Sequence, residues 1–408
     1  MTRLGSRSLP PRSPFASRFA LSPDVCFLNH GSFGATPREL SKLQTELRDR
    51  AEANPMQFWV RDLEPLLDRS RAALAALVGA RPGEIAFVPN ATAAVSTVLR
   101  SLRFRDGDEL LTTDHAYNAC KNALDFVASA SAAKVVVARI PFPIAREEDA
   151  ITPVLDAVTP RTRLVLLDHV TSPTGLVMPI APLASELRAR GVDLLVDGAH
   201  APGMIPLDLG ALGVPFYTGN CHKWLCTPKS AAMFYVREDR QAEIRPLAIS
   251  HGANATRTDR SRFLIEHEWV GTIDPTPYLV VADAIAWLSG IFPGGIGEVM
   301  KRNRALALEA RAILCEALGV EAPSPESMIG SLAAVPLPDG RGTGAPSALS
   351  WGDDLQRRLW ENHSIEVPIV PWPRAPKRLV RVSAQIYDSR EEYTYLADAL
   401  REELAAER

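Results

Sequence analysis

The sequence predicts an α/β protein: a mostly parallel, seven-stranded sheet with helices on both faces, followed by a smaller α+β C-terminal domain. Three observations predict this fold. Short apolar runs alternate with helical patterns from about residue 84 to 236, and the pattern changes after about residue 275. The length of 408 residues exceeds that of one ordinary domain. Strands that are apolar almost throughout are typical of a parallel sheet buried on both faces.

Seven apolar runs are the candidate strands of the large sheet. They lie at 84–90, 109–113, 134–140, 162–170, 193–197, 215–220 and 231–236. Helix-like stretches separate them, for example at 91–103, 117–130 and 180–190. Ligands of such sheets bind outside the carboxyl ends of the strands, so polar residues at those ends are the first candidates for a site.

Helices and strands are mixed in the last part of the chain. The order is two helices (275–292, 295–319), a strand (331–337), a loop rich in Gly and Pro (337–346), a helix (353–363), two strands (around 365–370 and 378–387) and a closing helix from Ser389. We therefore expect a flexible arm at 1–24, a large domain at 25–280 whose first part can pack with the small domain, and a small domain at 281–408.

Composition excludes several classes of function. The chain is 46% hydrophobic and carries a formal net charge of −3, so it has no global basic field to attract nucleic acid or an anionic membrane. It contains no apolar run of membrane-spanning length and no secretory signal in its first twenty residues. Five cysteines without framework spacing favour a reducing compartment, and we expect a cytoplasmic protein.

Three candidate residues follow predicted strands. Asn90 precedes a helix, where it either caps the helix or, with Thr92, helps form an anion seat at the helix N-terminus. Asp197 closes the run DLLVD, where a partly buried carboxylate needs a cation, unless it is a turn or N-cap residue. Lys223 follows PFYTGN with no acid nearby; it is either a surface lysine or a partly desolvated, nucleophilic amine.

One cofactor needs all three residues. Pyridoxal 5'-phosphate (PLP) requires a lysine for its aldehyde, an aspartate for its pyridine nitrogen and an anion seat for its phosphate. The sequence therefore predicts a PLP enzyme. Cys221, His222 and Cys226 lack a fourth ligand at metal spacing, so no metal site is expected.

Four segments carry a resemblance to a known family: NHGSFGATP (29–37), VDGAHAPG (196–203), TGNCHKWLCTPKSAAMFYV (218–236) and WVGTIDPTPY (269–278). They resemble the class V aminotransferase superfamily of fold-type I PLP enzymes, and within it the isopenicillin N epimerase-like branch. The resemblance runs from about residue 25 to the C-terminus.

The resemblance implies a role for each matching residue. Lys223 would carry PLP as an internal aldimine and later move the Cα proton, with Asp197 on the pyridine nitrogen and His200 on the phenolic oxygen. Arg381 would bind the substrate α-carboxylate, for which a bidentate guanidinium is suited. The remaining roles are implied for phosphate binding (Ala91, Thr92, His222, and Thr272 from the neighbouring subunit of a homodimer), stacking on the ring (His115 or Tyr117) and the vicinity of the substrate (Asn29, His30).

The reaction stays open among three types of chemistry at Cα of a small amino acid. Epimerisation or racemisation leads, with Tyr117, His115 or His30 as the second acid. The alternatives are β-elimination by a C–S lyase of the hercynylcysteine sulfoxide lyase type, with Tyr117 protonating the leaving sulfur, and transamination. Asn220 stands where many relatives have Ser. The loop IEVPIVPWP (365–373) lacks the cysteine of cysteine desulfurases, so desulfurase activity is not expected.

Overall fold

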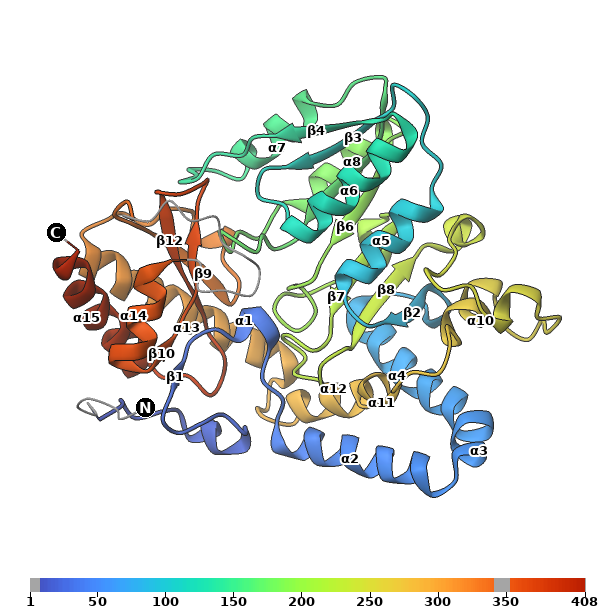
Figure 1. The fold of residues 1–408 in the computed structure, drawn as a ribbon, viewed down its shortest axis with the longest axis horizontal. Helices are drawn as coiled ribbons and strands as arrows, with labels where there is room; N and C mark the ends of the chain where they lie inside the picture. The colour runs from blue at the N-terminus through green and yellow to red at the C-terminus, as the bar shows by residue number, and fades with distance from the viewer. Residues whose placement is uncertain (1–7, 341–352, 408) are drawn as a thin grey trace.

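The structure is a computed structural model that describes residues 8–340 and 353–407 (Figure 1). Its centre is a seven-stranded sheet in the order β2-β8-β7-β6-β5-β3-β4, in which only β8 runs antiparallel to its neighbours. The strands are β2 (Ile85–Val88), β3 (Glu109–Thr113), β4 (Lys134–Ala138), β5 (Thr162–Asp168), β6 (Asp193–Asp197), β7 (Phe216–Asn220) and β8 (Ala232–Val236). The predicted fold class and all seven strands are confirmed.

Helices cover both faces of this sheet. One face packs on α5 (Ala91–Ser101), α6 (Asn118–Ser131) and α10 (Arg262–Glu268), and the other on α4 (Leu63–Val78), α7 (Glu148–Asp156) and α8 (Ile180–Ala189). Successive residues of β5 alternate between the two cores: Leu164 and Leu166 face α5 and α6, whereas Val165 and Leu167 face the opposite side. This burial on both faces explains why the strands are apolar throughout.

The small domain is a three-stranded antiparallel sheet with helices packed on it. The strand order is β11-β12-β9, and α13 and α15 pack against each other, as do α14 and α15. Its elements are β9 (Leu332–Leu337), β11 (Ile369–Pro371), β12 (Arg378–Ser383), α13 (Gly295–Leu318), α14 (Asp354–His363) and α15 (Arg390–Ala406). Ser389 caps α15 in a capping box with Glu392.

The N-terminal segment is joined to this small domain. β1 (Cys26–Phe27) pairs in parallel with β10 (Ile365–Glu366), and the short helix α1 (His30–Phe33) follows directly. Phe19 is buried, with its ring 4.8 Å from that of Tyr387. Residues 8–24 are therefore packed on the protein, which differs from the flexible arm expected at 1–24; residues 1–7 lie outside the described part.

Two other expectations differ from the structure. The domain border expected at 280/281 lies later, because α12 (Val281–Ser289) and the start of α13 pack into the large-domain core, and the small-domain core begins near Ala307. Helices not anticipated from the sequence occupy much of 38–78, among them α2 (Arg38–Ala53) and α4. The expected loop at 337–346 falls largely outside the described residues. Across the described residues, no helix is both long and apolar enough to cross a membrane.

Candidate active site

Lys223 lies in the turn after β7, where its surroundings favour the neutral amine. Its Nζ is 3.0 Å from Nε2 of His200. The indole N–H of Trp224 donates to Nδ1 of His200, and burial keeps the pKa of His200 well below its usual value, so Nε2 carries the proton and donates it to the amine. Burial, and next the charge of Arg381, lower the pKa of Lys223 to about 7. The amine can therefore act as a nucleophile near neutral pH.

His30 holds the backbone of Lys223 in place. Its Nε2 lies 2.9 Å from the Lys223 carbonyl and its Nδ1 lies 2.9 Å from the hydroxyl of Tyr387. Burial lowers the pKa of His30 to about 3, so the ring is neutral, donates to the carbonyl and accepts from the tyrosine. Both ring nitrogens are engaged with the protein, so the ring positions Lys223 and has no nitrogen left for a substrate.

Asp197 ends β6 and has a donor for each carboxylate oxygen. The Cys120 thiol, from α6, donates to Oδ2 at 3.1 Å, and the backbone N–H of Ala199 donates to Oδ1 at 3.0 Å. In the β5–β6 ladder Asp197 lies directly opposite Asp168, whose Oδ1 is buried without a hydrogen-bond partner. The strand ends therefore hold two adjacent carboxyl groups, of which sequence reasoning selected only one.

The predicted anion seat lies at the N-terminus of α5. Asn90 caps the helix by accepting from the Ala93 N–H, and the Ala91 N–H donates to Oδ1 of Asn220 at 2.9 Å. Ala91 was expected to hold the phosphate, but its backbone N–H already donates to Asn220. Thr92 is the next residue of the helix. His222 has its Nδ1 2.9 Å from the Ala231 carbonyl and is neutral because burial lowers its pKa to about 4.

Arg381 is a buried cation, and no described carboxylate pairs with it. It donates to the backbone carbonyl of Ser172 at 2.6 Å, to Oγ of Ser32 at 3.1 Å and to Oδ1 of Asn29 at 3.5 Å. Its Nε is buried without a partner, and burial lowers its pKa to about 10. A buried guanidinium without an acid is costly unless a ligand supplies one, so this group fits a substrate carboxylate.

The structure separates the two aromatic candidates after β3. His115 is fully buried, with Nδ1 2.8 Å from Thr174 Oγ1, Nε2 3.0 Å from the Ile140 carbonyl and its ring 4.2 Å from that of Trp372. Tyr117 is 47% exposed, and Asp197 and Arg381 both act electrostatically on its hydroxyl. Of the two side chains, Tyr117 is therefore the one that is accessible and interacts with Asp197 and Arg381 of the site.

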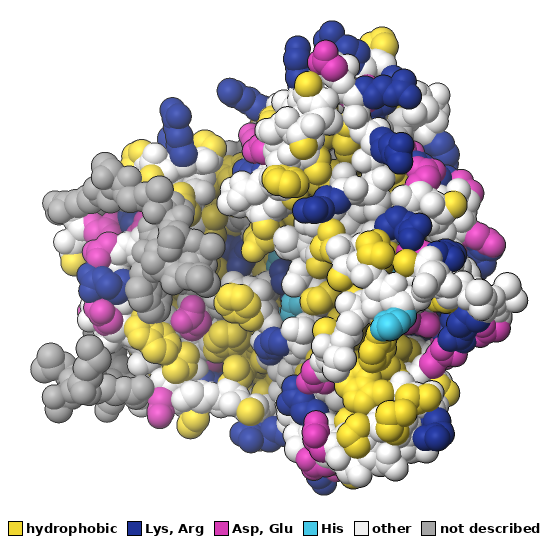
Figure 2. Space-filling view, turned by 45° about the vertical axis from the view of Figure 1, so that its right-hand side comes forward, with side chains coloured by type: hydrophobic (Ala, Val, Ile, Leu, Met, Phe, Trp, Pro, Cys, Tyr) yellow, Lys and Arg dark blue, Asp and Glu magenta, His cyan; other side chains and the backbone are white. Residues whose placement is uncertain are grey.

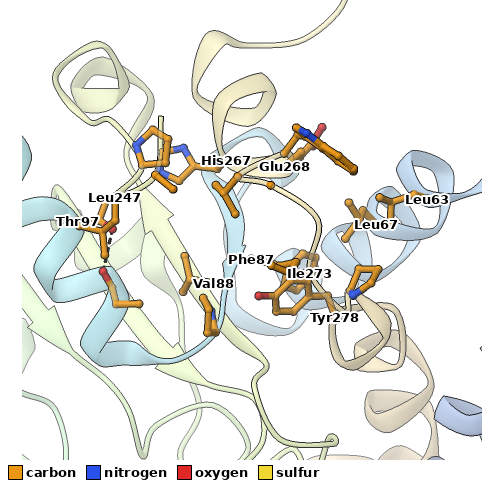
Figure 3. A pocket seen from close by; sticks show the side chains of 18 of the residues that line it. Leu63, Leu67, Phe87, Val88, Thr97, Leu247, His267, Glu268, Ile273 and Tyr278 are labelled. Atoms are coloured by element: carbon orange, nitrogen blue, oxygen red, sulfur yellow. Dashed lines mark hydrogen bonds between the residues drawn. The ribbon is translucent and has the colours of Figure 1, made fainter. Parts of the chain in front are cut away.

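Thr272 is exposed in the segment between α10 and α11 (Thr276–Leu279), and no described contact joins it to the other predicted site residues. The same segment borders an apolar pocket of about 180 Å³ that lies apart from Lys223. Figure 3 shows Leu63 and Leu67 of α4, Phe87 of β2 and Tyr278 of α11 around it, and the rings of Phe87 and Tyr278 are stacked at 5.4 Å. Among the described residues, no three His, Cys, Asp or Glu side chains gather as metal ligands.

These groups fit PLP. A nucleophilic lysine, a hydrogen-bonded aspartate, a capped helix N-terminus and an unpaired arginine converge at the carboxyl ends of β5, β6 and β7, and an unsatisfied buried carboxyl oxygen lies among them. Lys223 would bind the aldehyde, Asp197 the ring nitrogen, and Thr92 and His222 the phosphate. Fold and site together define a PLP-dependent enzyme of fold type I.

The chain belongs to the class-V aminotransferase family, whose model matches residues 50–349. It is 36% identical to the isopenicillin N epimerase of Amycolatopsis lactamdurans, over 94% of this chain and 96% of that protein. It is 31% identical to a probable chloroplastic L-cysteine desulfhydrase of Arabidopsis thaliana, over 93% of this chain and 82% of the other. Among solved structures, the cysteine desulfurase CsdA of Escherichia coli matches with a TM-score of 0.76 at 19% identity, over 97% and 98% of the chains, and shares the fold.

Sequence reasoning missed several residues of this site. Asp168 closes the run TRLVLLD just as Asp197 closes DLLVD, so the rule that found one would have found the other. The remaining contacts come from distant parts of the chain that no local pattern connects: Cys120 on α6, Ser32 on α1, Ser172 after β5, and Tyr387 after β12.

Proposed function

We propose that this protein uses PLP at Lys223 to act at Cα of a small amino acid, and that its reaction is epimerisation or racemisation of the isopenicillin N epimerase type. PLP bound to a lysine supplies an electron sink that acidifies the Cα–H bond. The observation that carries the proposal is the neutral Lys223 amine, 3.0 Å from His200 and beside a buried, unpaired Arg381. Arg381 would hold the α-carboxylate while Lys223 moves the Cα proton.

Epimerisation needs a second group that returns a proton to the other face of Cα. Tyr117 fits this role because a tyrosine hydroxyl keeps its proton at neutral pH, and the partial burial of this one raises its pKa further. The ring nitrogens of His30 and His115 are engaged with other protein groups. Two epimerase relatives, at 36% and 34% identity, support this reaction as the lead.

C–S β-elimination is the second candidate. The L-cysteine desulfhydrase relative and a hercynylcysteine sulfoxide lyase of Schizosaccharomyces pombe, 24% identical over 94% of this chain, support it. In that reaction the protonated hydroxyl of Tyr117 would supply a proton to the leaving sulfur group. The same residues could thus serve either reaction, so the two reactions must be distinguished by their products.

The first experiment asks whether Lys223 carries the cofactor. PLP-loaded protein is reduced with borohydride and digested, and we expect the label on the peptide that contains Lys223, with none in Lys223→Ala. Lys229→Ala, six residues along the chain, is the matched control and should label normally. A label elsewhere, or normal turnover by Lys223→Ala, would contradict the proposal.

The second experiment identifies the reaction. A panel of L- and D-amino acids and cysteine conjugates is incubated with enzyme in deuterium oxide. Deuterium at Cα of recovered substrate with inverted configuration supports epimerisation. Pyruvate from a cysteine conjugate supports β-elimination, and conversion of the cofactor to its pyridoxamine form together with a keto acid supports transamination.

We also propose that the protein is a homodimer in which Thr272 of one subunit reaches the phosphate site of the other. Supporting this, Thr272 is exposed, and its neighbours Gly271 and Ile273 line an apolar pocket. Large apolar side chains are exposed nearby, including Leu247 and Ile273, which line that pocket, and Ile249. Hydrophobic side chains gather at the lower right of the face shown in Figure 2.

A further inference from the structure

Asp168 and Asp197 form a buried carboxyl pair at the carboxyl ends of β5 and β6. They are register partners in a parallel ladder and are 5% and 3% exposed. Register partners on adjacent strands point to the same face of a sheet, and here that face packs against α5 and α6, from which Cys120 reaches Asp197. Both carboxyl groups thus face the same cofactor site.

Two adjacent carboxyl groups in a buried site do not both ionise near neutral pH. Burial raises the pKa of each, and the charge of Asp197 raises that of Asp168 further. Five other titratable groups interact with the pair: Lys223 from the turn after β7, Cys120 and Lys121 from α6, Tyr117 at the start of α6, and Tyr217 of β7. The pKa of Lys223 is lowered to about 7, so this amine is only partly charged near neutral pH, and the two lysines do not compensate two full negative charges.

The hydrogen bonds show which member keeps the proton. Asp197 accepts from a thiol and from a backbone N–H, one at each oxygen, as a carboxylate should. The backbone N–H of Tyr117 acts to lower the pKa of Asp168, but Oδ1 of Asp168 has no donor. A buried oxygen without a donor is more costly for a carboxylate than for the uncharged acid, so the missing donor favours the protonated form of Asp168.

We propose that Asp168 is the neutral member of this pair and stays protonated in the PLP-loaded protein, so that Asp197 alone presents a negative charge to the cofactor's ring nitrogen. The inference rests on the cofactor site of the proposed function and adds a positioning residue to it. It also explains the state of Lys223, because a charged Asp168 would favour the protonated, non-nucleophilic amine. The proton on Asp168 therefore helps keep the amine reactive.

Asp168→Asn tests this inference, because asparagine is an uncharged isostere of the protonated acid, and Asp197→Asn is the matched control. We expect Asp168→Asn to bind PLP within about threefold of wild type, whereas Asp197→Asn weakens PLP binding by about tenfold or more, the loss expected for a hydrogen bond to a charged group. Equilibrium dialysis measures both affinities, and thermal unfolding checks that both variants fold.

Infrared difference spectra of the PLP-loaded proteins at neutral pH identify the proton directly. Wild type minus Asp168→Asn should contain the carbonyl band of a protonated carboxylic acid, shifted in deuterium oxide. Carboxylate bands in its place, or a tenfold loss of affinity in Asp168→Asn with little loss in Asp197→Asn, would overturn the inference. If Asp168→Asn fails to fold, Asp168→Ser, which is also uncharged, takes its place in the difference spectrum. Failure of the proposed function is a separate result, seen as loss of the borohydride label on Lys223.

Discussion

At the scale of single residues, the amine of Lys223 is made reactive by its surroundings. It lies 3.0 Å from the neutral His200 ring, and burial and the charge of Arg381 both oppose its protonation. A lysine in water would hold its proton until pH 10.4 or so, and almost none of it would be nucleophilic at neutrality. In this protein, burial is the largest cause of the lowered pKa of Lys223, and the charge of Arg381 lowers it further.

This state predicts the pH dependence of cofactor capture. The neutral amine is the reacting form, so the rate at which apoprotein takes up PLP covalently should rise with pH and reach half its maximum near pH 7, the lowered pKa of Lys223. Stopped-flow absorbance measures the rate. Arg381→Gln removes a positive charge that lowers this pKa, so its midpoint should move to higher pH. A midpoint above pH 9 in wild type would contradict this account.

Arg381 should contribute to substrate binding through its planar guanidinium. Arg381→Lys keeps the charge but loses bidentate geometry, and we expect the KM for the amino acid to rise about 10- to 100-fold, from the loss of one charge-assisted hydrogen bond, with a smaller change in kcat. Steady-state kinetics measures this change, with an amino acid that the panel of L- and D-amino acids identifies as a substrate. An amine that lacks the α-carboxylate is the control, and its binding should be unaffected.

The predictability of the site follows from where each contact originates. Lys223 and Asp197 follow apolar strands and were found by that position alone. His30 was expected near the substrate, but its ring bonds to the backbone of Lys223 and to Tyr387, two partners more than 190 residues away in the sequence. His115 could not be separated from Tyr117, because two residues of spacing do not specify which side chain turns into the core.

At the scale of elements, the strands were predictable and their directions were only partly so. Each strand from β2 to β6 is followed by a helix, which fixes the parallel part of the sheet. The chain between β7 and β8 contains no such helix, and β8 runs antiparallel. Helices α2 and α4 were missed, although Leu63, Leu67 and Leu74 repeat at helical spacing on the buried face of α4.

The junction between α1 and the turn that carries Lys223 depends on Gly34. This residue has φ +72°, and an added Cβ would overlap the backbone carbonyl of His222 and lie 3.2 Å from Cα of Lys223. Gly107 has φ +80° with open space around it, so it shares the backbone conformation without the close approach.

We therefore expect Gly34→Ala to be more damaging than Gly107→Ala. The left-handed conformation costs either variant about 1 kcal/mol of unfolding free energy, and the overlap at Gly34 adds about 1–3 kcal/mol. Urea unfolding measures the difference, and PLP affinity should fall only in Gly34→Ala. Equal losses of unfolding free energy in the two variants would contradict this account, because they would show that the added Cβ at Gly34 causes no destabilising overlap.

At the scale of the whole molecule, the proposed homodimer can be tested by a substitution in its proposed interface. Ile273 is 40% exposed beside the apolar pocket, so Ile273→Asp would bury a charge in the proposed interface and should release monomers with reduced PLP affinity. Light scattering coupled to size-exclusion chromatography measures the mass. Phe126→Asp, at an exposed apolar residue of α6, is the control and should stay dimeric. A monomeric wild type with full PLP affinity would contradict the proposal.

The pairing of β1 with β10, and the His30–Tyr387 bond, have a consequence for biosynthesis. A ribosome releases residues 26–30 long before residues 365–387, so the bond between His30 and Tyr387 cannot form until residue 387 has emerged. The residues of the central sheet are translated earlier. A fragment that ends before β10 would lack both the β1–β10 pairing and the His30–Tyr387 bond that position the turn with Lys223. We therefore expect vitamin B6 to load only after residue 387 has been translated.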